Sequence, residues 1–412
     1  MKPSVLFVAF HYPPIQMSSG VHRTVAFSRY LADNDWDVSV LTVTQSAYSN
    51  VNNLSEELIP QKVKVLRAFS FDTARDLAFK GKYFSWMAQP DRWLSWTASA
   101  VCKGWWELRK NPTQIIVSTY PIATAHIIGY LLHKITGRTW VADLRDPMLQ
   151  ENYPTDKTRR RIFQWIEKKI VKHASFAVLT SPGAIELYRQ RYPKLPDNFW
   201  NLIPNGFDEQ VFTGLQPSEP KLPNEKYTIL HSGTIYPEER DPTQLFAALQ
   251  QLKTQQPVIA SKINVVLRAT GHDSLFTSQI KQYGIEDIVK LLPSLDYRSA
   301  AAEMLDADAL LLLQGASCNF QTPAKAYEYI RAKRPLLVLA PEESDTYQLV
   351  KQTNVAVQAE LNDTAQIADA LKMLVKQLDN NNFHFLASED IQKFSREAGA
   401  AMLANALSEL QR

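Results

Sequence analysis

The feature of this sequence that most constrains its fold is the alternation of short apolar runs with longer segments of helical periodicity. A short apolar run bounded by turn residues predicts a buried strand, and apolar residues that recur every three or four positions predict a helix. In the first half, strands are predicted at residues 4–10, 38–43, 114–118, 139–143, 176–179 and 199–203, with helices at 21–32, 123–136 and 182–191. Strands joined through helices build a parallel sheet.

The second half repeats this alternation after a stretch at 213–224 that contains three prolines. Strands are predicted at 228–231, 264–270, 289–292, 309–313, 336–340 and 355–358, and helices at 242–255, 323–333, 364–378 and 390–410. Two such series predict an α/β protein with two doubly wound domains. The site is expected in a cleft between them, where the loops that follow the strands face each other.

The length of 412 residues agrees with two domains, because a single core rarely grows to that size. A turn signal at Pro204-Asn-Gly-Phe-Asp208 marks the division. We expect an N-terminal domain at 1–203 and a C-terminal domain at 204–389. The closing helix, at about 390–412, is expected to pack back on the first domain.

The cysteine count and the apolar runs bear on the compartment. Two cysteines, Cys102 and Cys318, give no disulfide framework and no metal cluster, which suits a reducing compartment. No export signal is recognised, and no run approaches the roughly 20 apolar residues that span a bilayer. The expectation is a cytoplasmic protein, at most peripheral on the inner face of the cell membrane.

Charge and tryptophan are concentrated in the first half. Residues 1–200 contain 26 Lys or Arg against 16 Asp or Glu, whereas residues 201–412 contain 19 against 26, and all nine tryptophans lie between Trp36 and Trp200. Residues 158–172 predict a basic amphipathic helix, a type that binds anionic lipid. Residues 80–110 add five tryptophans as interface anchors. The alternative for each segment is ordinary core packing. No nucleic-acid-binding module is recognised.

The segment from 310 to 340 predicts an anion site. Thr322 is a good helix N-cap and Pro323 suits the first helical position, directly after a buried strand. A helix N-terminus at the carboxyl end of a parallel strand attracts anions. Lys325 and Glu328 share one helix face, so the lysine is a candidate phosphate ligand and the glutamate a candidate acceptor for sugar hydroxyls. The alternative is a surface Lys–Glu pair on a capped helix.

Two further strand–helix loops resemble ligand loops. Ser19 and Gly20 precede the first helix, although the glycine fingerprint of dinucleotide-binding folds is missing. In the loop from His231 to Pro242, Gly233 allows a close approach of the backbone, and Arg240 can meet a phosphate in forked geometry. The alternatives are a plain connecting loop and an exposed arginine.

Charged residues also follow the strand at 139–143. Arg145 and Asp146 are predicted to point at a cleft, with pairing between them as the alternative, and His126 is more often structural than catalytic at such a position. The sequences Asp306-Ala-Asp308 and Asp33-Asn-Asp35 match a magnesium pattern by letter. Both precede strands instead of ending them, and we therefore expect no metal site.

Taken in order, several motifs resemble family-4 retaining glycosyltransferases of the GT-B fold. They are Tyr12-Pro13-Pro14 with Gly20 and Arg23, the segment from Ile203 to Asp208, the loop from His231 to Thr234, and Pro323-x-Lys325-x-Tyr-Glu328-Tyr. The resemblance covers nearly the whole chain. It implies transfer of a sugar, most simply from a UDP-sugar, to the hydroxyl of a glycan or lipid-linked glycan, in polysaccharide or glycolipid biosynthesis. No cofactor or bound metal is implied.

The resemblance also implies roles for the two domains and for single residues. The N-terminal domain at 1–203 would bind the acceptor, and the C-terminal domain at 204–389 would bind the nucleotide-sugar. Arg240 and Lys325 would be catalytic, because they stabilise the leaving diphosphate, and Glu328 would contact the nucleotide ribose. The donor-binding set is Ser19, Gly20, Gly233, Thr234, Gly271, Pro323, Tyr327 and Glu328. The acceptor side is Tyr12, Arg145, Asp146 and His126.

Several positions depart from the pattern of that family. Phe320 stands where a carboxylate often touches the transferred sugar, and Thr234 stands where many members have arginine. Ser19 replaces a frequent glycine, and Thr119-Tyr120 offers no match for a frequent histidine. Two alternatives therefore stay open: a nucleotide-sugar epimerase of the same fold, and a non-catalytic protein that binds sugar nucleotides.

Overall fold

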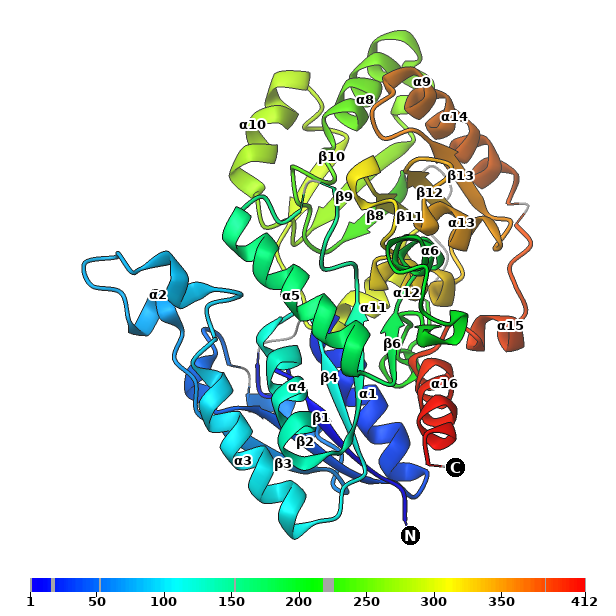
Figure 1. The fold of residues 1–412 in the computed structure, drawn as a ribbon. Helices are drawn as coiled ribbons and strands as arrows, with labels where there is room; N and C mark the ends of the chain where they lie inside the picture. The colour runs from blue at the N-terminus through cyan, green and yellow to red at the C-terminus, as the bar shows by residue number, and fades with distance from the viewer. Residues whose placement is uncertain are drawn as a thin grey trace. The chain divides into compact units, whose positions relative to one another are not determined.

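The computed structural model describes residues 2–15, 19–51, 53–151, 153–217, 226–381 and 383–411; the side chains of residues 19 and 53–55 lie outside this description. The chain forms two compact units (Figure 1). The first unit comprises Met1–Asn205 and Arg396–Arg412, and the second comprises Gly206–Ser395.

The first unit is built on a seven-stranded parallel sheet with the order β3-β2-β1-β4-β5-β6-β7. Its strands are β1 (Ser4–Val8), β2 (Asp37–Val43), β3 (Lys64–Ala68), β4 (Ile115–Thr119), β5 (Thr139–Arg145), β6 (Phe176–Leu179) and β7 (Trp200–Leu202). Its helices are α1 (Ser19–Asp33), α2 (Thr73–Asp76), α3 (Trp96–Lys110), α4 (Thr124–Thr136), α5 (Lys157–His173), α6 (Pro182–Arg191) and α16 (Arg396–Glu409). Short 3₁₀ helices are η1 (Gln45–Ala47), η2 (Asn53–Leu58), η3 (Ser85–Ala88) and η4 (Asp197–Phe199).

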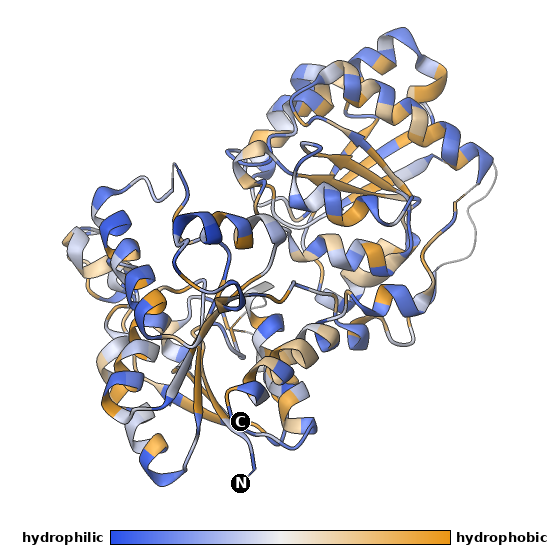
Figure 2. Ribbon diagram, turned by 45° about the vertical axis from the view of Figure 1, so that its right-hand side comes forward, coloured by the Kyte–Doolittle hydropathy of each residue, from blue (hydrophilic) through white to orange (hydrophobic). Residues whose placement is uncertain are grey.

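Both faces of this sheet are covered, which explains why a central strand such as β1 is buried along its whole length. Along β1, Leu6 and Val8 pack with α3, α4 and α5, whereas Val5 and Phe7 pack on the other face with α1 and α16. The alternation follows from the two-residue period of a strand. Figure 2 shows the apolar strands between helices that are apolar on one side only.

The second unit contains a six-stranded parallel sheet with the order β10-β9-β8-β11-β12-β13. Its strands are β8 (Tyr227–Ser232), β9 (Ile263–Arg268), β10 (Val289–Leu292), β11 (Ala309–Leu313), β12 (Leu336–Leu339) and β13 (Ala356–Ala359). Its helices are α7 (Glu209–Phe212), α8 (Thr243–Gln255), α9 (Pro257–Ala260), α10 (Asp273–Tyr283), α11 (Tyr297–Asp306), α12 (Ala324–Ala332), α13 (Asp345–Lys351), α14 (Thr364–Asn380) and α15 (Ser388–Gln392), with a 3₁₀ turn η5 (Ala316–Cys318). One face packs with α8, α10 and α14, and the other with α11, α12 and α13.

The predicted two-domain α/β fold is confirmed, and the structure corrects some local predictions. The single closing helix predicted at 390–410 is two helices, α15 and α16, because Ser395 leaves the helix to pair with Phe207. Strand β3 and helix α3 were not predicted. The apolar residues of β3 are interrupted by Lys64 and Arg67, and the strand is only half-buried, and the tryptophans of α3 obscured its helical period.

Helix α16 packs on α1 within the first unit. The second unit ends at residue 395, directly before α16. Within the described part of the chain, no helix is both long and apolar enough to cross a membrane.

Candidate functional site

In the second unit, the predicted anion-binding residues gather at the point where the strand order of the sheet reverses. Strands β8 and β11 are neighbours there, and the chain runs outward from them in opposite directions. Ligands of doubly wound sheets bind at the carboxyl ends of such strands. The loop after β8 carries Gly233 and Arg240, and the segment after β11 leads into α12 with Lys325 and Glu328.

A buried histidine positions Lys325. The Nδ1 atom of His231 lies 2.9 Å from the carbonyl oxygen of Leu311, so the ring donates from Nδ1 and its Nε2 is left as an acceptor. The Nζ atom of Lys325 donates to that Nε2 at 3.0 Å. Burial lowers the pKa of His231 far below its ordinary value, and the charge of Lys325 acts in the same direction. The lysine is therefore held by a neutral imidazole, which leaves its charge uncompensated.

Lys325 itself is easily deprotonated. Burial and the charge of Arg240 together lower its pKa to about 7, against the opposing effect of Glu328. An anion placed beside the ammonium would reverse these effects, because it stabilises the charged form. The lysine is thus suited to bind a phosphate that brings the missing negative charge.

Arg240 is the second cation of this site. Its Nε atom is buried and has no hydrogen-bond partner among the described residues. Its guanidinium lies 5.9 Å from the centre of the Tyr236 ring, and its backbone N–H donates to the Tyr236 carbonyl oxygen at 2.8 Å. A buried donor that is left unpaired costs about 1–3 kcal/mol, a penalty that a bound anion would remove.

Two glycines keep the approach to these cations narrow but open. Gly233 has a φ of 109°, which side chains rarely adopt, and a Cβ built on it would lie 3.3 Å from Lys325 Nζ. Gly271 has a φ of 80°, and its Cβ would lie 3.3 Å from the Cγ2 of Thr234. Gly271 and Thr234 therefore lie side by side in the loops that follow β9 and β8.

Helix α12 presents Glu328 in a fixed orientation. Its carboxylate accepts a hydrogen bond of 2.6 Å from the Tyr297 hydroxyl, and the residue is 8% exposed. Tyr329, on the same helix, accepts from the Ser232 backbone N–H at 2.9 Å and so ties α12 to β8. Tyr327 instead packs in the core beside Phe394.

The predicted start of this helix is one residue off. Pro323 is the N-cap with extended backbone, and the helix begins at Ala324 instead of at Pro323. The φ of −65° that the proline ring fixes suits both the first helical position and the cap position, and the extended ψ of 143° makes Pro323 the cap. Phe320, where a carboxylate is frequent in the resembling family, is 42% exposed.

In the first unit, the equivalent reversal of strand order lies between β1 and β4. A narrow pocket without room for a water molecule lies there, and Gly20 and Arg145 are among its lining residues, together with His11, Thr119 and Tyr120. Arg145 has a φ of 62° and donates to the carbonyl oxygen of Tyr120 at 2.9 Å. Burial lowers its pKa to about 10.

An internal ion pair underlies this pocket. Arg23 donates from Nε and Nη2 to the Asp143 carboxylate, at 3.3 Å each, and both side chains are buried. Arg23 also donates to the carbonyl oxygens of Ile203 and Pro204, which fixes the chain where it leaves the sheet. Thr119 completes the site by donating to Asp143 at 2.8 Å.

The remaining acceptor-side residues lie deeper in the first unit. His126 is buried, its Nδ1 atom lies 2.8 Å from the Ser118 hydroxyl, and its ring stacks on that of Tyr120. The hydroxyl of Tyr12 is 3.1 Å from that of Ser28 in the core. Asp146 is within 3.4 Å of the Thr180 hydroxyl, and burial raises its pKa. Ser19 begins α1, but its side chain lies outside the described residues.

The structure thus brings together His231, Gly233, Arg240, Lys325 and Glu328 in the second unit, and Gly20 and Arg145 in the first. Tyr12, His126 and Tyr327 lie in the cores instead of in a pocket. Sequence reasoning missed four residues of these sites, namely His11, Asp143, His231 and Tyr297. Three of them had one usable signal, because His11, Asp143 and His231 are polar residues at the carboxyl ends of apolar strands. Tyr297, at a helix start, had none.

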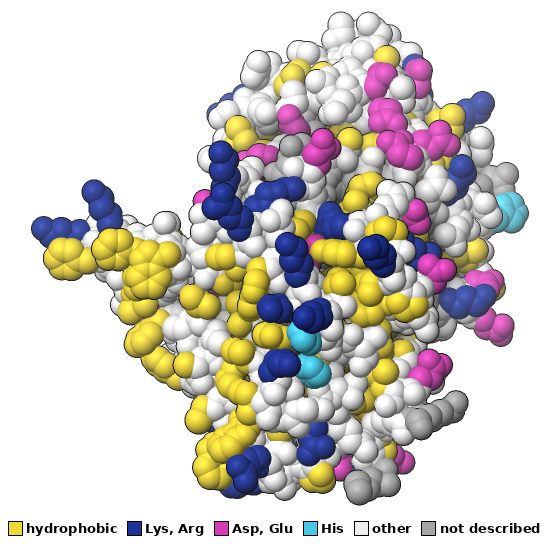
Figure 3. Space-filling view, viewed as in Figure 1, with side chains coloured by type: hydrophobic (Ala, Val, Ile, Leu, Met, Phe, Trp, Pro, Cys, Tyr) yellow, Lys and Arg dark blue, Asp and Glu magenta, His cyan; other side chains and the backbone are white. Residues whose placement is uncertain are grey.

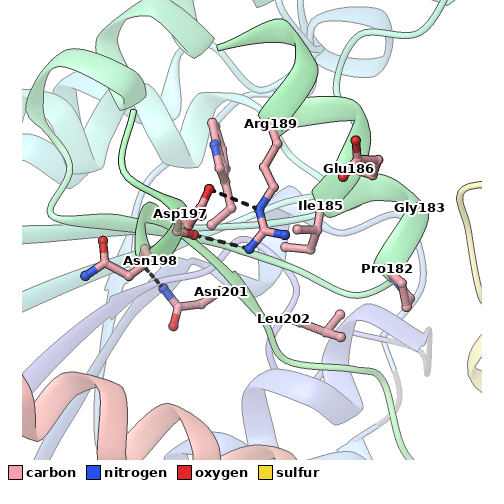
Figure 4. A pocket seen from close by; sticks show the side chains of 10 residues that line it. Pro182, Gly183, Ile185, Glu186, Arg189, Asp197, Asn198, Asn201 and Leu202 are labelled. Carbon is pink, nitrogen blue, oxygen red and sulfur yellow. Dashed lines mark hydrogen bonds and ion pairs between the residues drawn. The ribbon is translucent and has the colours of Figure 1, made fainter. Parts of the chain in front are cut away.

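A larger cavity of about 760 Å³ lies elsewhere in the first unit, between α6 and β7 (Figure 4). Its lining includes Ile185 and Leu202, with Glu186, Arg189 and Asp197 around them, and Arg189 lies 4.0 Å from Asp197. The cavity contains no predicted site residue. Within the described residues, no group of three or more His, Cys, Asp or Glu side chains is placed to hold a metal ion.

Comparison with known proteins gives structural similarity without sequence similarity. No protein-family model matches the chain, and no curated protein sequence matches it. Sucrose-phosphate synthase from Thermosynechococcus elongatus superposes with a TM-score of 0.70 at 15% identity, covering 99% of each chain.

Two further structures show the same relationship. The Anabaena protein HepE in complex with UDP gives a TM-score of 0.66 at 14% identity, over 99% of this chain and 100% of the other. WaaG, a glycosyltransferase involved in lipopolysaccharide biosynthesis, gives 0.59 at 13% identity, over 98% and 95%. Because these similarities cover the full length of both units, the chain has the GT-B fold of two Rossmann-like domains.

Proposed function

We propose that this protein is a glycosyltransferase that moves a sugar from a nucleotide-sugar to an acceptor hydroxyl with retention. The observation that carries the proposal is the pair of uncompensated cations in the second unit. Lys325 is held by a neutral histidine and Arg240 has an unpaired buried Nε, and both lie beside a glycine loop at the reversal of strand order. A diphosphate fits such a site, because it supplies two negative groups to two fixed donors.

The choice of UDP-sugar as the donor rests on the solved structures of the same fold. HepE is described in complex with UDP and with UDP-glucose. A trehalose-phosphate synthase from Burkholderia vietnamiensis, another solved structure similar to this chain, is described as UDP-forming. These proteins share the fold at low identity, so UDP-hexose is a proposal for this chain. The acceptor proposed is a glycan or a lipid-linked glycan of the cell surface.

The second-unit residues divide the chemical work between them. Lys325 and Arg240 hold the diphosphate and stabilise the charge that develops on it as the glycosidic bond breaks. Glu328 accepts hydrogen bonds from the ribose hydroxyls, with its carboxylate oriented by Tyr297. We propose that these side chains suffice without a resident metal. The first-unit pocket with His11, Gly20 and Arg145 is the proposed acceptor region.

Helix α5 is the proposed contact with an anionic membrane surface. Arg161, Lys168 and Lys172 are exposed on it, and the Nζ atom of Lys169 lies 5.4 Å from the Trp165 ring centre. Figure 3 shows Lys and Arg side chains gathered along this helix. Basic residues next to interfacial aromatics bind anionic headgroups. Reversal of Lys168 and Lys169 to Glu is expected to weaken sedimentation with anionic liposomes, and unchanged sedimentation would contradict the proposed contact.

A thermal-shift screen of UDP, GDP, dTDP and CMP and their sugars, each with and without EDTA, tests the donor proposal. A nucleotide at about one hundred times its Kd adds about 2.7 kcal/mol of stability to the folded state. We expect UDP and UDP-sugars to stabilise the protein equally with and without EDTA. Stabilisation that EDTA removes would overturn the metal-free part of the proposal, and stabilisation by another base alone would overturn the choice of UDP.

A matched pair of variants localises the effect. Glu328→Ala removes the ribose acceptor and should abolish the shift, whereas Glu286→Ala removes an exposed carboxylate of the same unit and should leave it unchanged. Release of UDP from UDP-glucose in the presence of acceptor then distinguishes turnover from binding. A nucleotide shift without any release across acceptor glycans would favour a non-catalytic sugar-nucleotide sensor, for which the exposed Phe320 is the relevant departure.

A further inference from the structure

A protruding hairpin in the first unit exposes an unusual concentration of aromatic side chains. Residues 69–95 surround α2 and project from the rest of the unit (Figure 1). Phe79 is 78% exposed, Phe84 72% and Trp86 66%, and Tyr83 is also exposed. In the space-filling view, the end of this projection carries hydrophobic and Lys or Arg side chains (Figure 3). Large apolar side chains grouped in this way on a surface indicate an interaction site.

The tip of the projection has a definite backbone structure. Phe79 and Lys82 exchange two backbone hydrogen bonds, of 2.9 and 3.0 Å. Between them Lys80 has a φ of 50° and Gly81 a φ of 74°, which are the positive values of a tight hairpin turn. The aromatic side chains are therefore presented by an ordered turn, and a Cβ on Gly81 would meet nothing within 4 Å.

The base of the projection is fastened to the first unit. The buried Thr73 side chain donates to the carbonyl oxygens of Met87 and Arg92, at 2.9 Å each, and its backbone N–H also donates to Arg92. Asp72 caps α2 and pairs with Arg92 at 3.5 Å. Buried polar contacts thus hold the base of the projection in place, whereas the aromatic tip is exposed.

The positive charge of the tip favours an anionic binding partner. The segment 77–86 contains Lys80 and Lys82 and no acidic residue. Aromatic side chains with adjacent lysines are typical of segments at the interface of an anionic bilayer. A bilayer also accepts a convex tip without a matching groove.

The base of the projection is joined to the basic helix α5. Gln89 donates to the Asp156 cap of α5 at 3.3 Å and accepts from Arg159 at 3.3 Å. Stable membrane attachment commonly needs two signals, one apolar and one electrostatic. The hairpin would supply the apolar signal and α5 the electrostatic one.

We propose that residues 77–86 form an anchor that inserts Phe79, Phe84 and Trp86 into the interface of an anionic lipid bilayer. The choice of a bilayer as the occupant rests in part on the membrane-linked acceptor proposed above. The anchor itself is argued from the exposure, the charge and the fastened base, and does not depend on the reaction.

Sedimentation with vesicles of phosphatidylcholine containing about 30% phosphatidylglycerol tests the anchor. The triple variant Phe79→Ser, Phe84→Ser, Trp86→Ser should bind these vesicles at least about tenfold more weakly than the natural chain, because it loses three large apolar side chains. A matched control removes three exposed apolar side chains of the second unit, in Val258→Ser, Leu275→Ser and Met373→Ser, and should bind like the natural chain. Equal binding by the triple variant would overturn the proposal.

Quenching of tryptophan fluorescence by lipids with brominated acyl chains tests insertion directly. Trp86→Phe keeps an apolar anchor but removes its fluorophore, so vesicle binding should persist while quenching falls. The control Trp106→Phe removes another exposed tryptophan and should leave the quenching intact. Quenching that is undiminished in Trp86→Phe would overturn the insertion. Self-association of the natural chain without lipid, lost in the triple variant, would instead identify the tip as a protein interface.

The test separates this inference from the proposed reaction. UDP stabilisation measured by thermal shift should be the same in the triple variant and the natural chain, since the tip lies outside the second unit. If the natural chain did not bind UDP, the donor proposal would be overturned and the vesicle result would still stand. Vesicle binding that is unaffected by the triple variant would overturn the anchor and leave the donor proposal standing.

Discussion

Charged residues lie near the carboxyl ends of the strands in both sheets, but an ion pair forms in the first-unit site, whereas the two cations of the second-unit site form no ion pair among the described residues. In the first unit, Arg23 and Asp143 neutralise each other and Arg145 donates to a backbone carbonyl. In the second unit, Lys325 is held by a neutral histidine and Arg240 has a buried unpaired Nε. The comparison teaches that one edge uses its charges to hold the fold, whereas the other keeps them available for an anionic ligand.

The largest expected effect tests the structural half of this comparison. Arg23→Met leaves Asp143 buried without its partner, a change that typically costs about 3–5 kcal/mol of unfolding free energy. Denaturant unfolding followed by tryptophan fluorescence measures it, because all nine tryptophans lie between residues 36 and 200 and so report the first unit. Lys2→Met breaks the exposed pair with Asp37 and should cost less than about 1 kcal/mol. Equal costs for the two variants would break the comparison.

Acid should destabilise the first unit through its buried histidines. Burial lowers the pKa of His126 to about 4, from 6.5 in an unfolded chain. The unfolded state therefore binds the proton first, and stability is lost as pH falls from 6.5 towards 4, by about 3 kcal/mol for this group. Unfolding curves at pH 7 and pH 4 measure the loss, and His126→Gln should reduce the difference between them. A pH slope that is unchanged in this variant would exclude His126 as its source.

Nucleotide affinity should depend on the uncompensated cations of the second unit. Lys325→Ala and Arg240→Ala should each weaken UDP binding by about 100-fold, or about 2.7 kcal/mol, since each removes a fixed charged donor to phosphate. Isothermal titration measures the affinity. Lys290→Ala removes an exposed lysine of β10 and should bind UDP like the natural chain. An affinity for UDP in Lys325→Ala equal to that of the natural chain would mean that the Lys325 ammonium has no role in binding.

The pH dependence of UDP binding sharpens the same point. The pKa of Lys325 is lowered to about 7, so the free protein loses this charge as pH rises from 7. A bound anion raises that pKa, and binding must then take up a proton. Affinity should fall by up to about tenfold per pH unit above 7. Lys325→Arg keeps its charge at all these values of pH and should flatten the profile. A profile that is already flat in the natural chain would contradict this role.

The smallest expected effect concerns the orientation of Glu328. Tyr297→Phe removes the 2.6 Å hydrogen bond to its carboxylate and should weaken UDP binding about fivefold, or about 1 kcal/mol. Tyr227→Phe is a matched control, because its hydroxyl donates to the exposed Asp379 at 2.9 Å. The affinities of UMP and of pyrophosphate, which has no ribose, test this route. If both affinities fell equally in Tyr297→Phe, Tyr297 would act on the phosphates instead of through Glu328.

Much of the fold could be predicted from the sequence because the pattern is local. The apolar run at 309–313 coincides with β11, since a strand covered on both faces needs continuous apolar residues. Strand β3 escaped prediction because an edge strand is only half-covered and keeps charged residues. The closing helix was predicted as one because its break at Ser395 depends on pairing with Phe207, almost 190 residues earlier in the chain.

Residue types and positions in the sequence by themselves determined a two-unit α/β protein with Lys325, Glu328, Gly233 and Arg240 in the segments that follow two strands. Only the tertiary structure decided the state of these groups. His231 is neutral because burial and the charge of Lys325 lower its pKa, and Lys325 is easily deprotonated because it is buried and lies near Arg240. Burial and proximity arise between segments distant in the chain, so no local pattern records them.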